Sequence, residues 1–455
     1  MEEQVRLEEN KMGVMPINKL LISMSIPMMI SMLVMALYNI VDSIFVAKLN
    51  EDALTAVSLA FPIQNLMIAF GTGTGVGVNA LLSRSLGAKD TEYANKIANN
   101  GLKLSIFTYA AFAILTGVLG GFYFRVQTNN QAILNYGISY IHIVGVMSFG
   151  MFLQMMSEKL LQSTGKTIYT MITQLIGAIT NIILDPILIF GLFGFPRLEV
   201  AGAAVATVAG QILAGIVALL FNMKYNQEIE INLKKYKLSS HVVGHIYSIG
   251  VPSIIMASVS SVMTFGMNKI LMSFTATATA VFGVYYKLQS FVFMPVFGLN
   301  NGMVPIVAYN YGAKKPDRIT KTIQLSIIYA VSIMLVGLVI MQMCPVALLK
   351  LFSASDSMLS IGVPALKTIS FSFIFAGFCI VCSSVYQAFG HGVLSLLVSL
   401  IRQLAVLLPA AYILSKINGL DAIWWSFPIA EVASVILCTS FLIHVYRKEI
   451  KPLWN

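Results

Sequence analysis

The sequence predicts an all-α polytopic membrane protein, with twelve transmembrane helices in two six-helix lobes related by a pseudo-two-fold axis along the membrane normal. Composition is the first observation: of 455 residues, 57% are apolar and only 11% are charged, whereas about 25% are charged in an average soluble domain. The second is a succession of apolar runs long enough to cross a bilayer. The third is a match between the two halves of the chain. Together they exclude a soluble enzyme, a secreted disulfide scaffold and a disordered protein.

Twelve apolar segments have the length of membrane-spanning helices. In lipid only helices and closed barrels satisfy every backbone polar group, so each segment is expected to be helical. Several exceed the roughly 20 residues that a bilayer requires, which predicts tilt or protrusion into water. The expected spans are residues 17–46, 53–83, 94–124, 133–161, 167–191, 200–223, 243–273, 279–308, 318–343, 358–388, 392–415 and 421–444.

The Lys and Arg residues predict the orientation of these spans. With the N-terminus placed inside, most of the 29 basic residues fall on the inner side, including Arg84, Lys159, Lys237 and Arg447. Cytoplasmic loops of membrane proteins gather Lys and Arg, so both termini are expected in the cytoplasm. The same bias accounts for the net charge of +10 without a nucleic-acid partner. A signal peptide begins with a basic segment, whereas the residues before the first span here include Glu2, Glu3, Glu8 and Glu9.

The two halves of the chain match at an offset of 225 residues. Pro27 then meets Pro252, and Gly87-Ala88-Lys89 meets Gly312-Ala313-Lys314. An even number of spans per half gives both halves the same orientation, so substrate sites are expected between them near mid-membrane. The predicted domains are an N-lobe, a cytoplasmic linker and a C-lobe, at residues 1–223, 224–241 and 242–455.

Ionisable side chains inside the spans are the first candidates for function, because each costs at least a few kcal/mol in lipid. Asp185 is the sharpest case. Asn181 lies four residues earlier and shares its helix face, and Pro186 leaves the carbonyl of Ile182 without its helical donor. A carboxylate, an amide and a free carbonyl can hold a proton or a small cation. The alternative is a buried Asp that only caps a kink.

The other intramembrane charges allow more than one interpretation. Asp42 is expected at the same depth as Asp185, or else at the interface in contact with water. Glu158 lies about one turn from the inner end of its span, so it either reaches the interface or serves a proton relay. In the second half, Lys287, Arg402 and Glu431 are expected to be buried and to form an ion pair or network. Structural pairing is favoured there over gating.

Two motifs that resemble chemical sites are discounted. The glycine run from Gly71 to Gly77 follows no strand and lies inside an apolar span, which favours close helix packing over nucleotide binding. Cys379 and Cys382 have a metal-site spacing but no partner ligands, so no metal site is expected. No nucleophile, base and oxyanion site come together, so we expect no catalytic residues and no enzyme.

A few Met, aromatic and polar side chains near the acids are candidates for a substrate pocket. Met is flexible and suits promiscuous surfaces, and aromatic faces attract organic cations. The candidates on spans one, two and four are Met35, Tyr38, Asn39, Gln64, Tyr140 and Met151.

Five segments of the chain resemble the multidrug and toxic compound extrusion (MATE) transporters, in their DinF-like and MepA-like prokaryotic branch. They are residues 25–29, 37–42, 87–89, 181–186 and 202–207. The similarity runs along essentially the whole chain, and residues 181–186 are its most specific part. Twelve spans in two six-helix lobes fit this family.

The resemblance implies a secondary active antiporter that exports amphipathic, often cationic organic compounds and drugs in exchange for inward H⁺ or Na⁺. It places the family's cation site on Asp42, Asn181, Asp185 and Thr207, and makes Tyr140 and Glu158 candidates for a proton relay. It further implies a monomer in the inner (plasma) membrane of a prokaryotic cell, with no cofactor besides the coupling ion. A lipid or lipid-linked oligosaccharide flippase of similar architecture is the alternative, kept open by Lys287 and Arg402.

Overall fold

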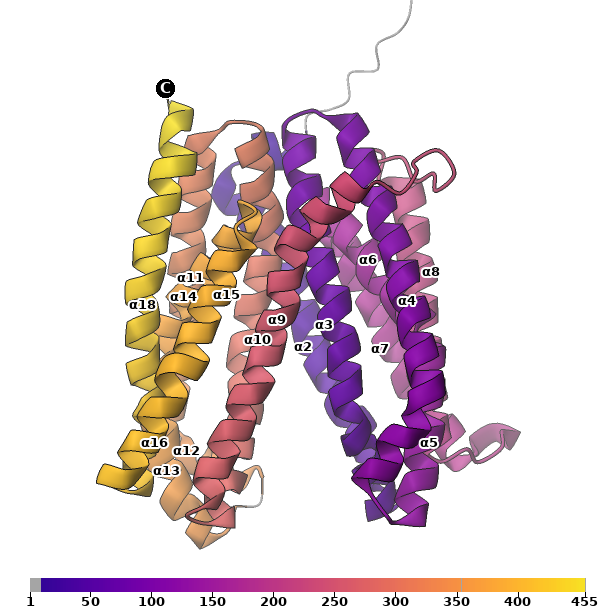
Figure 1. Ribbon diagram of the computed structural model, residues 1–455, viewed down its shortest axis with the longest axis vertical. Coiled ribbons are helices and arrows are strands. Elements are labelled where there is room, and N and C mark those ends of the chain that lie inside the picture. Colours follow the sequence, from indigo (N-terminus) through magenta and orange to yellow (C-terminus); the bar gives the residue numbers. More distant parts are fainter. Residues whose placement is uncertain (1–9, 353, 455) are drawn as a thin grey trace, which may run out of the picture.

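The computed structural model describes residues 10–352 and 354–454, and the four N-terminal glutamates named above lie outside these ranges. Within them the chain forms helices and no β-strand. Figure 1 shows two bundles of long, roughly parallel helices side by side. After the short α1 (Lys11–Val14), the first bundle consists of α2 (Ile17–Ala47), α3 (Glu51–Gly87), α4 (Thr91–Gln127), α5 (Gln131–Val146), α6 (Phe149–Ser163), α7 (Thr167–Phe190), η1 (Leu192–Gly194) and α8 (Val200–Tyr225).

The second bundle repeats this order after a segment without helix between Tyr225 and Ser240. It consists of α9 (Ser240–Met272), α10 (Ala276–Gly312), α11 (Pro316–Met343), α12 (Pro345–Lys350), α13 (Asp356–Ser370), α14 (Phe373–Ala388), α15 (Gly392–Leu400), η2 (Ile401–Leu407), α16 (Leu408–Ile417), α17 (Leu420–Ile423), α18 (Ser426–Val445), η3 (Tyr446–Ile450) and η4 (Lys451–Trp454).

The twelve expected spans are present, but two of them are broken. In the described part of the chain, ten helical stretches are long and apolar enough to cross a membrane, and two bent pairs bring the number to twelve. Residues 133–161 and 358–388, each predicted as one span, are bent by 44° and 50°. At each break a serine hydroxyl donates to the backbone, Ser148 to Gly145 and Ser372 to Ile369. Such local bonds compete with a continuous helix, and an apolar run does not reveal them.

The two halves of the chain also match in the positions where helices end and in the residues that cap them. Helices α3 and α10 begin and end at positions 225 residues apart. The side chains of Asn50 and Thr275 cap these two helices by accepting from Ala53 and Ala278. Lys89 and Lys314, at the end of the Gly-Ala-Lys triplets, both have a left-handed backbone, with φ of 61° and 54°. The similarity between the halves is therefore structural as well as sequential.

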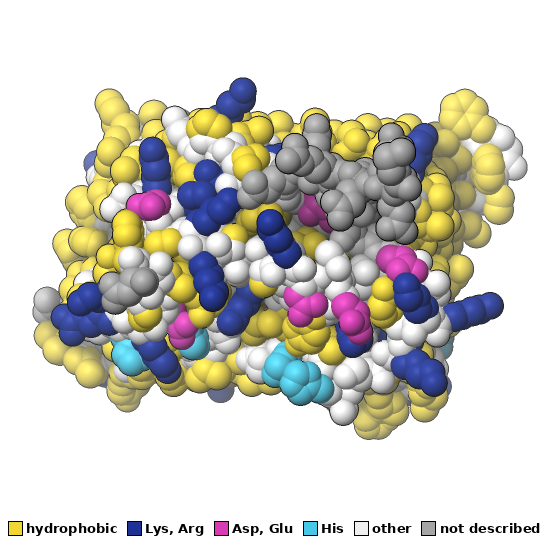
Figure 2. Space-filling model, turned by 90° about the horizontal axis from the view of Figure 1, so that it is seen from above, with side chains coloured by type: hydrophobic (Ala, Val, Ile, Leu, Met, Phe, Trp, Pro, Cys, Tyr) yellow, Lys and Arg dark blue, Asp and Glu magenta, His cyan; other side chains and the backbone are white. Residues whose placement is uncertain are grey.

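The two bundles meet at the end that carries the chain termini, which we call the basic end, and diverge towards the opposite end (Figure 1). Figure 2 looks onto the basic end, where many Lys and Arg side chains gather. Small residues allow close contact between the bundles. A Cβ at Gly73 would lie 2.8 Å from the carbonyl oxygen of Gly250 on α9, and one at Gly302 would lie 2.9 Å from Cα of Ser25 on α2.

These inter-bundle contacts obey the repeat, because Gly73 corresponds to Gly298 and Gly77 to Gly302. The prediction that the Gly71–Gly77 run serves helix packing is therefore confirmed.

Two short segments at the basic end hold the bundles together. Before α1, Asn10 donates to the carbonyl of Thr164 in the first bundle at 3.1 Å. Arg318 of α11, in the second bundle, donates to the carbonyls of Met12 and Met15 at 2.9 and 2.8 Å. The connecting segment is hydrogen-bonded to α4, where Asn99 donates to the carbonyl of Glu230 at 2.7 Å. The linker predicted at residues 224–241 is thus held against the first bundle by hydrogen bonds.

Candidate functional site

A buried polar cluster of the first bundle lies between α7 and α8. Asp185 and Asn181 are 0% and 2% exposed, and Thr207 of α8 is 8% exposed. The Asn181 amide satisfies both neighbours when its nitrogen faces Asp185 and its oxygen faces Thr207. It then donates to Asp185 at 3.2 Å and accepts from the Thr207 hydroxyl at 3.2 Å. The helical spacing predicted the first contact, whereas Thr207 came from the family resemblance.

Asp42 completes this cluster from α2. Its carboxyl group is close enough to that of Asp185 for the two to interact electrostatically, and its Oδ1 is buried without a hydrogen-bond partner in the described part of the chain. Among the residues that the structure describes, no Lys or Arg forms an ion pair with either acid. Two ionised carboxylates repel each other at this distance, so the arrangement favours a shared proton or a bound cation.

A cavity of about 220 Å³ lies beside this cluster. Asn181 and Thr207 line it, and so do Met35, Tyr38 and Met151 from the predicted pocket set. The other members of that set lie elsewhere. Gln64 donates to the hydroxyl of the buried Tyr140 at 3.2 Å, and the exposed Asn39 donates to the carbonyl of Met35 in its own helix at 2.8 Å.

Glu158 lines the same cavity and is buried, with 5% exposure. Gln154 and Thr173 donate to its Oε1 at 2.9 and 3.0 Å, and Gln174 donates to its Oε2 at 2.9 Å. The interpretation that this side chain reaches the interface is therefore wrong. Three neighbouring donors replace water for the carboxylate, so it can stay inside the bundle.

Lys159 also lines the cavity, although its charge predicted a position on the basic inner surface. Its Nζ donates to Gln162 at 2.9 Å and to Asn301 of α10 at 3.1 Å. Lys159 therefore connects the two bundles across the cavity that it lines. A signal was available, since Glu158 and Lys159 are adjacent charges inside one apolar span.

In the second bundle, Arg402 and Glu431 form the predicted buried ion pair, with Nη1 of Arg402 3.0 Å from Oε1 of Glu431. Arg402 lies on the π-helical turn η2. Lys287 does not join them, so its assignment as a buried charge is wrong. It is exposed, and its ammonium group lies 5.8 Å from the centre of the Phe352 ring. A long apolar stem allows a lysine to leave a helix bundle in this way.

Comparison with known proteins now identifies this architecture. The MatE family model matches residues 27–187 and again residues 252–413, once in each half of the repeat. The chain belongs to the MatE family. It is therefore a multi-pass membrane transporter and not an enzyme.

Members of the MatE family with known names or structures resemble the chain over nearly its whole length. The multidrug export protein MepA of Staphylococcus haemolyticus is 29% identical over 95% of this chain and 94% of its own. A protein named FAD transporter from Shewanella oneidensis is 25% identical over 93% and 94%. A solved structure described as the outward-facing conformation of a multidrug resistance MATE transporter is 25% identical, covers 98% of both chains and has a TM-score of 0.91.

Proposed function

We propose that the protein is a multidrug efflux antiporter, which exports amphipathic, often cationic organic compounds in exchange for inward H⁺ or Na⁺. The observation that carries this proposal is the pair of facing carboxyl groups, Asp42 and Asp185, beside a cavity lined by Met35, Tyr38 and Met151. The names of the MepA relatives support the substrate class.

The geometry supports a specific mechanism of coupling. Asp42 and the cavity residues Met35 and Tyr38 lie on one helix, α2, whereas Asp185 lies on α7. A proton or Na⁺ between the two carboxyl groups removes their repulsion and draws α2 towards α7, which changes the cavity wall. The ion and the drug then favour different shapes of the cavity, and this difference in affinity is what couples their movements.

Both coupling ions suit the site. Asp42, Asp185, Asn181 and Thr207 all offer oxygen atoms, which are the donors that a hard cation such as Na⁺ prefers. A pair of adjacent carboxyl groups also holds one proton. For a proton, Tyr140 and Glu158 are candidates for a relay, because Tyr140 lies near the acids and Glu158 lies on the wall of the adjoining cavity.

We further propose that the basic end faces the cytoplasm, with both termini inside, in a prokaryotic plasma membrane. Figure 2 shows the Lys and Arg side chains on which this orientation rests. The bundles pack against each other at that end, so the conformation described above is closed towards the cytoplasm. Transport then requires that the bundles separate at the basic end and close at the opposite one.

A second candidate is transport of a phosphate-bearing compound, including the lipid-linked substrates of a flippase. Lys159 favours it, since a cation on the cavity wall attracts a phosphate group. One relative is named FAD transporter, and FAD is a phosphate-bearing compound.

Efflux from vesicles tests these proposals. Vesicles with the purified transporter receive either a sodium gradient or a pH gradient, and ethidium or a flavin nucleotide is the probe. Ethidium movement under one gradient and its loss in Asp185→Asn support the antiporter. Asp421→Asn is the matched control, because it removes an exposed carboxylate outside the cluster. Unchanged ethidium efflux in Asp185→Asn would refute the proposed ion site.

A further inference from the structure

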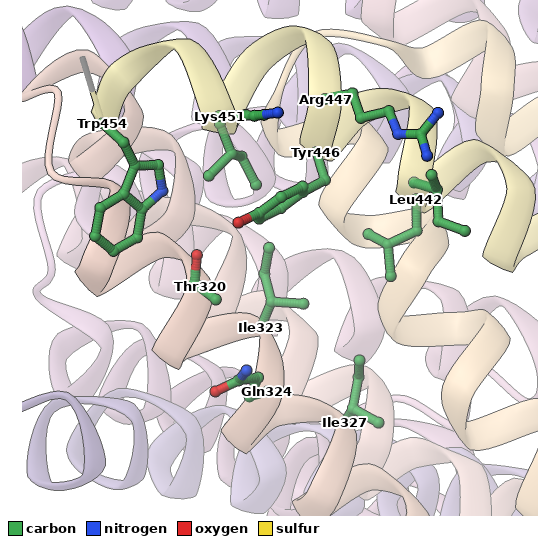
Figure 3. A pocket seen from close by; sticks show the side chains of 11 residues that line it. Thr320, Ile323, Gln324, Ile327, Leu442, Tyr446, Arg447, Lys451 and Trp454 are labelled. Atoms are coloured by element: carbon green, nitrogen blue, oxygen red, sulfur yellow. The ribbon is translucent and has the colours of Figure 1, made fainter.

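A groove of about 690 Å³ lies on the surface of the second bundle, away from the proposed transport site. It runs between the first turns of α11 and the chain from the end of α18 through η3 and η4. Figure 3 shows its lining side chains, with Trp454 and Thr320 at one end and Leu442 and Ile327 at the other. The stretch from Leu442 to Trp454 covers about 18 Å at helical rise, as long as a lipid head group with part of its acyl chains.

The polarity of the groove changes along this length. Lys451, Trp454 and Thr320 lie towards the basic end of their helices, whereas Ile327 and Leu442 lie deeper in the bundle. The apolar end continues into the exposed apolar surface of α18 and α11, where Ile443 and Ile328 are 47% and 56% exposed. A ligand that fits this surface has a polar head at the basic end and an apolar body along the helices.

The polar end of the groove carries polar side chains that are unpaired in the described part of the chain. The hydroxyl oxygen of Thr320 is buried and has no hydrogen-bond partner in the described part of the chain. Figure 3 shows it pointing towards the space below Tyr446. Arg447 and Lys451 also line the groove, and neither forms an ion pair within residues 10–352 and 354–454.

The repeat shows what occupies the equivalent surface of the first bundle. Thr320 and Gln324 correspond to Asn95 and Asn99 of α4. There the connecting segment fills the surface: Asn95 and Asn99 accept from the backbone nitrogens of Glu230 and Asn232 at 2.7 and 2.8 Å. The fold thus builds this surface twice and covers one copy with its own chain.

The second copy differs from the first in charge. At the offset of 225 residues, Arg447 and Lys451 correspond to the neutral amides Asn222 and Asn226, which are buried and bonded to Ser157 of α6 and to each other. The first copy holds a peptide backbone through asparagines, whereas the second copy offers two cations and an aromatic pair, Tyr446 and Trp454. Cations attract phosphate, and Tyr and Trp favour the interface between lipid and water.

We propose that this groove binds one anionic phospholipid, with its phosphate at Arg447 and Lys451 and its acyl chains along Ile323, Ile327 and Leu442. The proposal requires only that the helices span a membrane, and it is independent of the transported substrate. Each cation near an anionic membrane surface adds roughly a fivefold preference, so two predict a preference of about 25-fold for an anionic over a zwitterionic lipid.

Native mass spectrometry of the full-length protein tests this proposal, with phosphatidylglycerol and phosphatidylcholine offered in equal amounts. The unchanged protein is expected to retain phosphatidylglycerol about 25-fold better than phosphatidylcholine. The double variant Arg447→Gln/Lys451→Gln should lose most of this preference, whereas Lys224→Gln/Lys448→Gln, which removes the same charge outside the lining, should keep it. Gln324→Trp fills the groove without a change in charge and should also release the lipid.

Three outcomes would overturn the proposal. Equal retention of the two lipids by the unchanged protein is the first. Retained preference in Arg447→Gln/Lys451→Gln is the second. The third is displacement of the lipid by millimolar inorganic phosphate, which would identify a phosphate site rather than a lipid site. Monodisperse elution and an unchanged melting temperature of each variant show that a loss of lipid is not a loss of fold.

Discussion

A single methyl group at Gly298 should push the two bundles apart at their contact. A Cβ at this position of α10 would lie 2.5 Å from Cα and 2.6 Å from the backbone nitrogen of Met29 on α2. Ordinary contacts of a Cβ begin near 3.4 Å, so one helix must move by about 1 Å. Backbone cannot rotate aside as a long side chain can, and the whole contact between α2 and α10 has to yield.

The expected magnitude follows from the cost of overpacking. Extra methyl groups in well-packed interiors cost about 1–3 kcal/mol. This cost applies to the conformation that is closed at the basic end, because the separated bundles leave room for the methyl group. Gly298→Ala should therefore shift the equilibrium between the two conformations by about 5- to 150-fold towards the separated one.

Gly283→Ala is the matched control, since it lies on the same helix and a Cβ there would meet nothing within 4 Å. Both changes improve helix propensity equally, by about 1 kcal/mol. Spin labels at Lys89 and Lys314, which are exposed at the basic end of the two bundles, report the separation by pulsed electron resonance. Lys89 and Lys314 are each replaced by cysteine to carry a label. The exposed Cys344 is first replaced by Ser so that only these two cysteines are labelled.

The expected result is a longer distance population in Gly298→Ala that is absent in Gly283→Ala. Identical distance distributions in the two variants would show that the glycine contacts do not determine the balance between conformations. Ethidium efflux in the same variants then tells whether this balance limits transport.

Three further predictions concern stability. Arg402→Gln leaves Glu431 as an unpaired buried charge, so it should destabilise the protein by about 3–5 kcal/mol in thermal unfolding, whereas equal stability would mean that solvent reaches the pair. Asn99→Ala removes two hydrogen bonds to the connecting segment, each worth about 1 kcal/mol. It should therefore speed backbone hydrogen exchange in residues 229–233. Unchanged exchange would show that Asn99 does not hold the connecting segment. Burial raises the pKa of Glu228 above its ordinary 4.5, so the folded protein holds this proton more tightly than the unfolded chain. The contribution of Glu228 to stability should fall as pH rises from about 4.5 through the raised pKa. The melting temperature measured against pH tests this, and an equally steep fall with pH in Glu228→Gln would refute it.

The amino-acid sequence is sufficient to predict the spans, the two-lobed repeat and the family. Each of these depends on rules local to a segment: lipid requires about 20 apolar residues per helix, and the repeat is readable from matched positions such as Gly87 and Gly312. The contact of Asn181 with Asp185 was equally accessible, because four residues along a helix return to the same face.

The rotation of each helix about its axis, and the places where helices break, emerge only in the folded molecule. Folding turned Lys159 into the cavity and Lys287 away from the bundle, although both lie in apolar spans. It brought Asp42 to Asp185 across two helices. The physical reason is that side chains facing lipid and side chains facing other helices are both apolar, so the pattern along one span does not fix its rotation. That rotation is set by packing between helices far apart in the chain, as at Gly298 and Met29.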